Sequence, residues 1–214
     1  MVAEVARERQ HRVRVLGAAH NENAKALGSE TLADVDVVVD FTTPHAVIHN
    51  IEACIRHRMN MVVGTTGWYG EIPRIKKLVE ESGTGFVYAA NFSIGVNLFF
   101  DIVRAGAPAL RYGYEGNIIE KHHVHKKDAP SGTAAQIRNV VRDAIHAELP
   151  IESVREGEIV GLHQVTLDSA ADTITLVHDS KSRRGFAEGA VRAAEWVKGK
   201  RGFYDFKDIF RELG

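Results

Sequence analysis

Side chains able to do chemistry concentrate in residues 120–134, which read Glu-Lys-His-His-Val-His-Lys-Lys-Asp-Ala-Pro-Ser-Gly-Thr-Ala. Three of the chain's 11 histidines, His122, His123 and His125, lie in this segment. Histidine changes its charge nearest to neutral pH and is also a frequent metal ligand. The segment therefore predicts proton transfer or ligand binding.

The Pro-Ser-Gly turn that ends at Gly132 is expected to begin a helix. Backbone N–H groups at a helix start have no partner within the helix, and the positive end of the helix dipole lies there, so the position suits a carboxylate or phosphate. Ser131 and Thr133 add hydroxyl donors, and Lys126 adds an ammonium group. Imidazoles beside such an anion-binding helix start predict that the site binds an acidic substrate and delivers a proton to it.

Two other interpretations of the histidine cluster stay open. If residues 116–125 form a strand, alternation places His123 and His125 on one face and His122 with Val124 on the other. Adjacent strand histidines that point to opposite faces suit chelation poorly, and no cysteine lies nearby. A metal site and a solvated basic edge without chemistry are the alternatives.

The composition of the 214 residues is that of a globular protein, with 44% apolar and 26% charged residues. The 27 Lys and Arg nearly cancel the 28 Asp and Glu, so no net basic field is available for nucleic acid or an anionic membrane. The single cysteine, Cys54, cannot form an internal disulfide, which favours a reducing compartment. No stretch is long and apolar enough to cross a bilayer. We expect a cytoplasmic protein with neither a nucleic acid nor a membrane as partner.

Strands and helices are expected to alternate in the first half of the sequence. An apolar helical pattern opens the chain, and strands are predicted at 12–16, 35–41, 61–63 and 86–90. Thr43 and Pro44 are typical of a helix start, and further helices are expected at 47–55 and 72–79. This alternation predicts an α/β domain built on a parallel sheet.

The pattern changes near residue 92. Helices are expected around 98–103 and 133–148, and strands at 116–125, 158–167 and 173–178. The last two strands are joined so directly that they must be antiparallel. Helices at 186–198 and 206–213 end the chain. The second part is predicted to be an α+β domain with a mixed sheet, and the C-terminal helices (189–214) are expected to pack back on the first domain (1–92).

Several motifs together resemble one family. The string His-His-x-x-Lys-x-Asp-Ala-Pro-Ser-Gly-Thr-Ala is similar to the signature of the 4-hydroxy-tetrahydrodipicolinate reductases, long called dihydrodipicolinate reductases. Supporting motifs are Asp40-Phe41-Thr42 with Pro44, Gly64-Thr65-Thr66-Gly67, Ala90-Asn91-Phe92-Ser93-x-Gly95-Val96-Asn97, Gly157-x-Ile159-Val160-Gly161-x-His163, Ser182-Arg183 and Gly189-Ala190-Val191-Arg192-Ala193-Ala194. The resemblance covers nearly all of residues 35–214.

The resemblance implies hydride transfer from NADPH or NADH to a cyclic imine dicarboxylate on the diaminopimelate route to lysine. It implies that His122 donates or accepts a proton and that Lys126 takes part in proton donation. The substrate-binding residues it implies are His123, Gly132 and Thr133, and the Ser131 hydroxyl is expected to bind substrate beside them. An enamine-like intermediate left by the hydride must be protonated by an adjacent acid.

The resemblance also implies a Rossmann-like dinucleotide-binding domain (1–92) and a substrate-binding and oligomerisation domain (93–188) that forms a homotetramer through its sheet. Expected cofactor-binding residues lie at carboxyl ends of parallel strands, where open α/β sheets bind ligands; they are Phe41, Gly64, Thr65, Thr66, Ala89, Ala90, Asn91 and Phe92. Residues 18–21 offer no acidic side chain for a ribose hydroxyl and no arginine for a 2′-phosphate. NADPH and NADH both stay open.

The sequence departs from the family pattern at its start. The family begins with a strand and a glycine-rich loop before a helix, whereas Met1 lies where that helix should be. Because the loop holds the cofactor pyrophosphate, we expect an N-terminally truncated Rossmann-like domain. The explanations are a start site placed too late, a shortened chain or a degenerate homologue, and in-frame codons upstream test the first. The alternative functions are a binding or assembly module deficient in cofactor binding and, less favoured, a metal hydrolase that uses the histidines.

Overall fold

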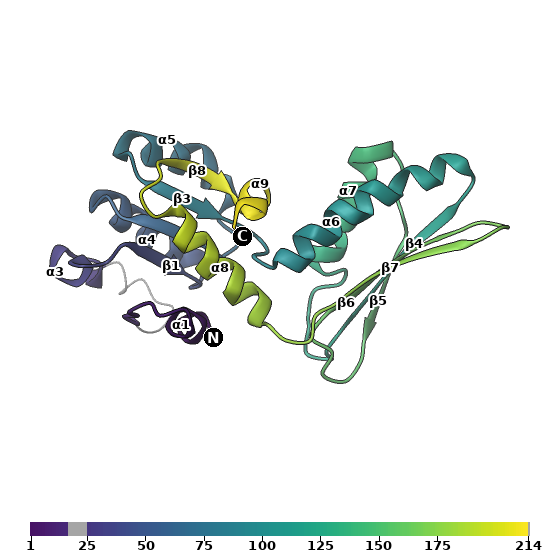
Figure 1. Ribbon diagram of the computed structural model, residues 1–214, viewed down its shortest axis with the longest axis horizontal. Helices are drawn as coiled ribbons and strands as arrows, with labels where there is room; N and C mark the ends of the chain where they lie inside the picture. The colour runs from purple at the N-terminus through teal and green to yellow at the C-terminus, as the bar shows by residue number, and fades with distance from the viewer. Residues whose placement is uncertain (17–24, 214) are drawn as a thin grey trace. The chain divides into compact units, whose positions relative to one another are not determined.

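The computed structural model describes residues 1–16 and 25–213 (Figure 1). The chain forms two compact units. Unit 1 consists of Met1–Ser93 and Phe186–Gly214, and unit 2 of Ile94–Gly185. In the described residues, no helix is long and apolar enough to cross a membrane.

Unit 1 is built on a parallel sheet. Its strands are β1 (Val37–Asp40), β2 (Asn60–Val63), β3 (Gly85–Tyr88) and β8 (Gly202–Asp205), in the order β1-β2-β3-β8. The predicted parallel α/β arrangement is confirmed. Figure 1 shows the yellow end of the chain returning to this sheet, where β8 pairs with β3. β8 was not expected, because its four residues form a strand only where β3 supplies a backbone partner.

Helices α4 (Pro44–Arg56) and α5 (Ile72–Ser82) connect these strands. The predicted start of α4 is confirmed, because the Thr43 side chain caps it by accepting a hydrogen bond from the Ala46 N–H. The remaining helical segments of unit 1 are α1 (Val2–Glu8), α3 (Ser29–Leu32), η1 (Tyr69–Glu71), α8 (Arg184–Val197, from the last residues of unit 2), α9 (Phe206–Ile209) and η3 (Phe210–Glu212).

The strand expected at 12–16 is wrong. Residues 11–16 have no regular secondary structure, and Val15 is 65% exposed. In this stretch no backbone pairing to another strand occurs, and a short apolar run without a partner strand leaves its N–H and C=O groups to water. The predicted coenzyme-selecting positions 18–21 lie outside the described residues.

Unit 2 contains a mixed sheet with the order β5-β4-β6-β7. Its strands are β4 (Glu115–His122), β5 (Ile151–Arg155), β6 (Leu162–Asp168) and β7 (Thr173–Asp179). β5 runs parallel to β4, whereas β6 is antiparallel to both β4 and β7. The predicted mixed sheet and its antiparallel pair are confirmed, and β5 was not predicted.

Helices α6 (Ile94–Gly106) and α7 (Gly132–Ile145) cover one face of this sheet, with the 3-10 segment η2 (Ala107–Tyr112) between α6 and β4. Phe99, Val103 and Ile137 from the helices pack against Ile118 and Val165 from the strands. This apolar core fixes which side chains of β4 are buried.

β4 ends earlier than the sequence predicted. It stops at His122, and Val124 and His125 form a turn, so alternation does not place His123 and His125 on one sheet face. The backbone of residues 122–124 instead pairs with the segment after β5: the Glu156 N–H donates to the His122 carbonyl, and the Val124 N–H donates to the Gly157 carbonyl. β6 likewise begins at Leu162 rather than near residue 158.

Candidate active site

A buried polar group lies at the end of β4, on the face that the helices cover. Burial alternates along this strand, so Ile118, Glu120 and His122 share one face. Ile118 belongs to the apolar core, whereas Glu120 is 0% exposed and carries a carboxylate. A buried carboxylate requires hydrogen-bonding or charged partners.

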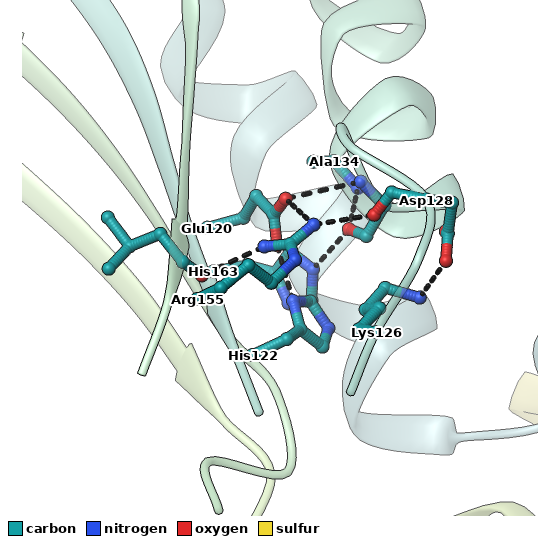
Figure 2. Close-up of polar contacts among 9 residues, drawn as sticks. Glu120, His122, Lys126, Asp128, Ala134, Arg155 and His163 are labelled. Carbon is teal, nitrogen blue, oxygen red and sulfur yellow. Dashed lines mark hydrogen bonds and ion pairs between the residues drawn. The ribbon is translucent and has the colours of Figure 1, made fainter. Parts of the chain in front are cut away.

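Glu120 has partners on both carboxylate oxygens, as Figure 2 shows. Its Oε2 is hydrogen-bonded to His122 Nδ1. Its Oε1 accepts a hydrogen bond from Arg155 Nη2 at 2.8 Å and a longer one from the Ser131 N–H at 3.3 Å. The carboxylate thus joins β4, β5 and the residue that precedes α7.

The electrostatics of this pair follow from burial and charge. Burial alone would raise the pKa of Glu120, but the hydrogen bonds from Arg155, Ser153 and His122 outweigh it and hold the pKa below its usual value. Burial lowers the pKa of His122 despite the neighbouring carboxylate. Glu120 is therefore ionised and His122 neutral near pH 7.

A second histidine lies beside the first. His163, buried on β6, has its ring centroid 5.2 Å from that of His122. Its Nε2 lies 3.1 Å from the Ser131 hydroxyl, which also accepts a hydrogen bond from the Ala134 N–H and so caps α7. Burial, with the charge of a protonated His122 as a further cause, lowers the pKa of His163 to about 4. His163 is neutral in the folded protein at neutral pH.

Lys126 lies in the loop between β4 and α7. Its Nζ forms an ion pair with Asp128 Oδ1 at 2.9 Å, and its charge contributes to the lowered pKa of His122. Arg155 Nη2 also donates to the Asp128 carbonyl at 2.6 Å, so the guanidinium ties this loop to Glu120. Figure 2 shows Lys126 and Asp128 on the loop beside the buried group.

The structure brings together His122, Lys126 and Ser131 among the expected residues. Gly132 and Thr133 are the first two residues of α7. His123 is half-buried, and its Nδ1 is buried without a hydrogen-bond partner among the described residues. The roles predicted for these residues stay predictions.

Sequence reasoning did not single out Glu120, Arg155 and His163. The sequence does point to Glu120, because a residue two positions before His122 lies on the same face of a strand. It also points to His163, as the histidine of a quoted motif. It does not point to Arg155, since β5 was not predicted.

Glu120, His122 and His163 each offer one potential ligand atom, all within 4.8 Å of one another. Both carboxylate oxygens are already engaged, and the Arg155 guanidinium would repel a cation placed there. The arrangement favours a proton-handling network, and it does not favour the metal hydrolase.

The expected cofactor residues lie at the carboxyl ends of β1, β2 and β3 in unit 1. Asp40, the last residue of β1, is buried and accepts hydrogen bonds from Thr65 Oγ1, from the N–H and hydroxyl of Thr42 and from Asn50 Nδ2. It thereby connects the turns that follow β1 and β2. Thr65 is engaged in this network, whereas Thr66 and Ala90 are exposed.

Close packing against backbone explains Gly189, and the Phe41 side chain lies against Gly64. A Cβ on Gly64 would lie 2.1 Å from the Phe41 ring, and one on Gly189 would lie 1.8 Å from the Phe92 carbonyl oxygen. Phe92 is buried, with its ring centroid 6.0 Å from that of Phe41 and 4.8 Å from that of Phe206. The structure thus brings Phe41, Gly64 and Phe92 together, and the buried Phe92 ring packs against the rings of Phe41 and Phe206.

Comparison with known proteins covers both units. Residues 2–92 match the family described as dihydrodipicolinate reductase, N-terminus, and residues 95–210 match dihydrodipicolinate reductase, C-terminus. The chain is 38% identical to the 4-hydroxy-tetrahydrodipicolinate reductase of Christiangramia forsetii over 194 residues, covering 84% of this chain and 81% of that protein. It is 38% identical to the enzyme of the same name from Neisseria meningitidis over 198 residues, covering 83% of this chain and 73% of that protein.

A solved structure supports the same relationship. The dipicolinate-bound dihydrodipicolinate reductase from Paenisporosarcina sp. TG-14 matches with a TM-score of 0.71 and 27% identity, covering 86% of this chain and 78% of that one. The α/β fold with a parallel and a mixed sheet agrees with this match. The chain belongs to the dihydrodipicolinate reductase family, whose members are nicotinamide-dependent oxidoreductases.

Proposed function

We propose that this chain reduces 4-hydroxy-tetrahydrodipicolinate to tetrahydrodipicolinate on the diaminopimelate route to lysine. The observation that carries the proposal is the 38% identity to reductases of that name across both units. The buried Glu120–His122 pair beside the start of α7 supplies a chemical basis for it. The reaction replaces a hydroxyl group with hydrogen, so a hydride and a proton are taken up and water is released.

Unit 2 is proposed to bind the dicarboxylate. The start of α7, at Gly132 and Thr133, favours a carboxylate through its backbone N–H groups and the helix dipole. Lys126 adds a positive charge, and His123 is a further proposed contact. The Paenisporosarcina relative carries dipicolinate, a dicarboxylate, which supports a substrate of this class.

His122 and Lys126 are proposed to handle the protons. His122 is neutral near pH 7, so it can take up a proton and return it to the substrate. Lys126 lies close enough to influence the charge of His122 and is proposed to assist donation.

The nicotinamide cofactor supplies the hydride, and unit 1 is proposed to hold it at the carboxyl ends of its parallel strands. Phe41, Gly64, Thr66 and Ala89–Phe92 are the proposed contacts, with Thr65 held in place by Asp40. Both NADPH and NADH are candidates. We also propose a cytoplasmic location and a homotetramer formed through the sheet of unit 2.

A reductase assay with each cofactor tests the proposal. Consumption of NADPH or NADH that depends on the cyclic dicarboxylate is expected, and its absence with both cofactors would contradict the proposed function. His122→Gln and Lys126→Ala should lower kcat by about 10²–10⁴-fold with cofactor binding retained, as loss of a general acid–base group does. Fluorescence titration of the chain with each cofactor tests the alternative function, a binding or assembly module deficient in cofactor binding. For such a module we expect no cofactor binding below millimolar concentration.

A further inference from the structure

The partners of Glu120 determine which nitrogen of His122 carries hydrogen. Glu120 is ionised, and an ionised carboxylate can only accept hydrogen bonds. The bond between Glu120 Oε2 and His122 Nδ1 therefore requires hydrogen on Nδ1. In the neutral imidazole, Nε2 is then left with its lone pair.

Glu120 is itself held in one orientation. Arg155 from β5 and the Ser131 N–H from the start of α7 both donate to Oε1, which leaves Oε2 directed at the imidazole (Figure 2). Arg155 is in turn bonded to two carbonyl oxygens, those of Val154 and Asp128. The carboxylate cannot rotate away from His122 without breaking bonds to two other segments.

Gly161 borders the His122 imidazole at Nε2. A Cβ on Gly161 would lie 3.0 Å from His122 Nε2, so any side chain there would push the imidazole aside by a few tenths of an ångström. Nδ1 is bound to the carboxylate, and Nε2 is the atom with an available lone pair.

We propose that Glu120 is a positioning residue that holds His122 with hydrogen on Nδ1, so that the proton is taken up and delivered at Nε2. The inference rests on the proposed reductase function and adds a residue to its proton transfer. Nε2 binds one proton from solvent, which gives an imidazolium beside the Glu120 carboxylate. The proton then bonds to a ring carbon of the enamine-like intermediate, and His122 returns to its neutral form.

The charges around His122 show why the carboxylate is needed. Arg155 and Lys126 disfavour its protonation, His163 is buried and neutral beside it, and Glu120 is the anionic group that favours it. Replacing Glu120 with glutamine removes that support. It also supplies an amide that can donate to Nδ1 and so stabilise the opposite tautomer.

The tautomer can be measured without any reaction. In the ¹⁵N-labelled wild-type chain, long-range proton–nitrogen NMR should show His122 with hydrogen on Nδ1 and a lone pair on Nε2 near neutral pH. In Glu120→Gln, the form with hydrogen on Nε2 should increase. A wild-type His122 with hydrogen on Nε2 would overturn the proposal even if the chain is an active reductase.

Kinetics provide the second readout. Glu120→Gln should lower kcat by about 10²–10⁴-fold with little change in the KM of the dicarboxylate, the range found when general acid–base catalysis or its orienting carboxylate is lost. Because the His122 imidazolium delivers the proton, the alkaline limb of the kcat profile, which reports its deprotonation, should shift to lower pH. Glu120→Asp should restore part of the activity. Glu115→Gln, an exposed change on the same strand, is the matched control and should leave kcat unchanged.

The two proposals fail in different ways. An inactive wild-type chain contradicts the reductase function, and its His122 tautomer can still be measured. An active wild-type chain whose Glu120→Gln variant keeps the same kcat and pH profile contradicts the positioning role. If Glu120→Gln does not fold, the wild-type tautomer and the activity of Glu120→Asp decide the question.

Discussion

Two buried carboxylates, one in each unit, have different partners. Asp40 ends β1 and is 4% exposed, and the described donors that reach it are hydroxyl, amide and backbone N–H groups, all uncharged. Glu120 lies near the end of β4, and its partners include a guanidinium and an imidazole. Both carboxylates are satisfied, but one is coupled to charges and the other is not.

This difference separates a structural role from a chemical one. Uncharged donors fix the positions of turns, and they do not change their charge near neutral pH. An imidazole does exchange protons, so the carboxylate bound to it influences where the proton resides. Asp40 therefore orders the turns at the proposed cofactor edge, whereas Glu120 acts on the protonation of its neighbour.

The largest expected effect on stability comes from Arg155→Met. It leaves the Glu120 carboxylate buried without its cation, and we expect a loss of about 3 kcal/mol in the free energy of unfolding at neutral pH. The loss should shrink in acid, where Glu120 in the variant becomes protonated. Urea denaturation at several pH values measures it. Arg104→Met, which removes an exposed ion pair on α6, is the control. An equal loss of unfolding free energy in both variants would contradict the special role of Arg155 as the cation of a buried carboxylate.

His163→Gln should change how stability depends on pH. The pKa of His163 falls from 6.5 to about 4 on folding, so the unfolded chain takes up a proton first as the pH falls. Wild-type stability should therefore decrease by about 2–3 kcal/mol between pH 6.5 and 4 from this group, and the variant should lack that part. Denaturation curves for both proteins test this, with exposed His49→Gln as control. Parallel pH dependences would contradict the burial of a neutral His163.

Among these three variants, Asp40→Asn should have the smallest effect on the free energy of unfolding. The amide replaces one accepting oxygen with a donor that faces other donors, and we expect a loss of about 1–2 kcal/mol in unfolding free energy. The KM of the cofactor should rise because Thr65 and Thr42 lose their anchor, while the pH profile of kcat should stay as in the wild type. Asp36→Asn, at a surface ion pair, is the control. A shifted pH profile would show that both carboxylates are coupled to the chemistry.

Much of the fold could be predicted from local patterns. Thr43 and Pro44 mark the start of α4, and the apolar runs of β1, β2 and β3 give the parallel sheet. The prediction was wrong at 12–16 and overextended β4, because a short apolar run becomes a strand only beside a partner. β5 and β8 were missed for the same reason: their neighbours along the sheet, β4 and β3, are distant in the sequence.

The sequence by itself determined the family, the histidine segment that is the candidate site and the helix start beside it. These are local properties, since a motif and a helix cap depend on residues within a few positions of one another. Only the tertiary structure decided that Arg155 on β5 and His163 on β6 meet Glu120 and His122. Strand pairing brings these residues together, and burial with the neighbouring charges shifts the pKa values of Glu120, His122 and His163. The protonation of Glu120 and of His163 therefore depends in part on Arg155 and His122, respectively, which lie more than 30 positions away in the sequence.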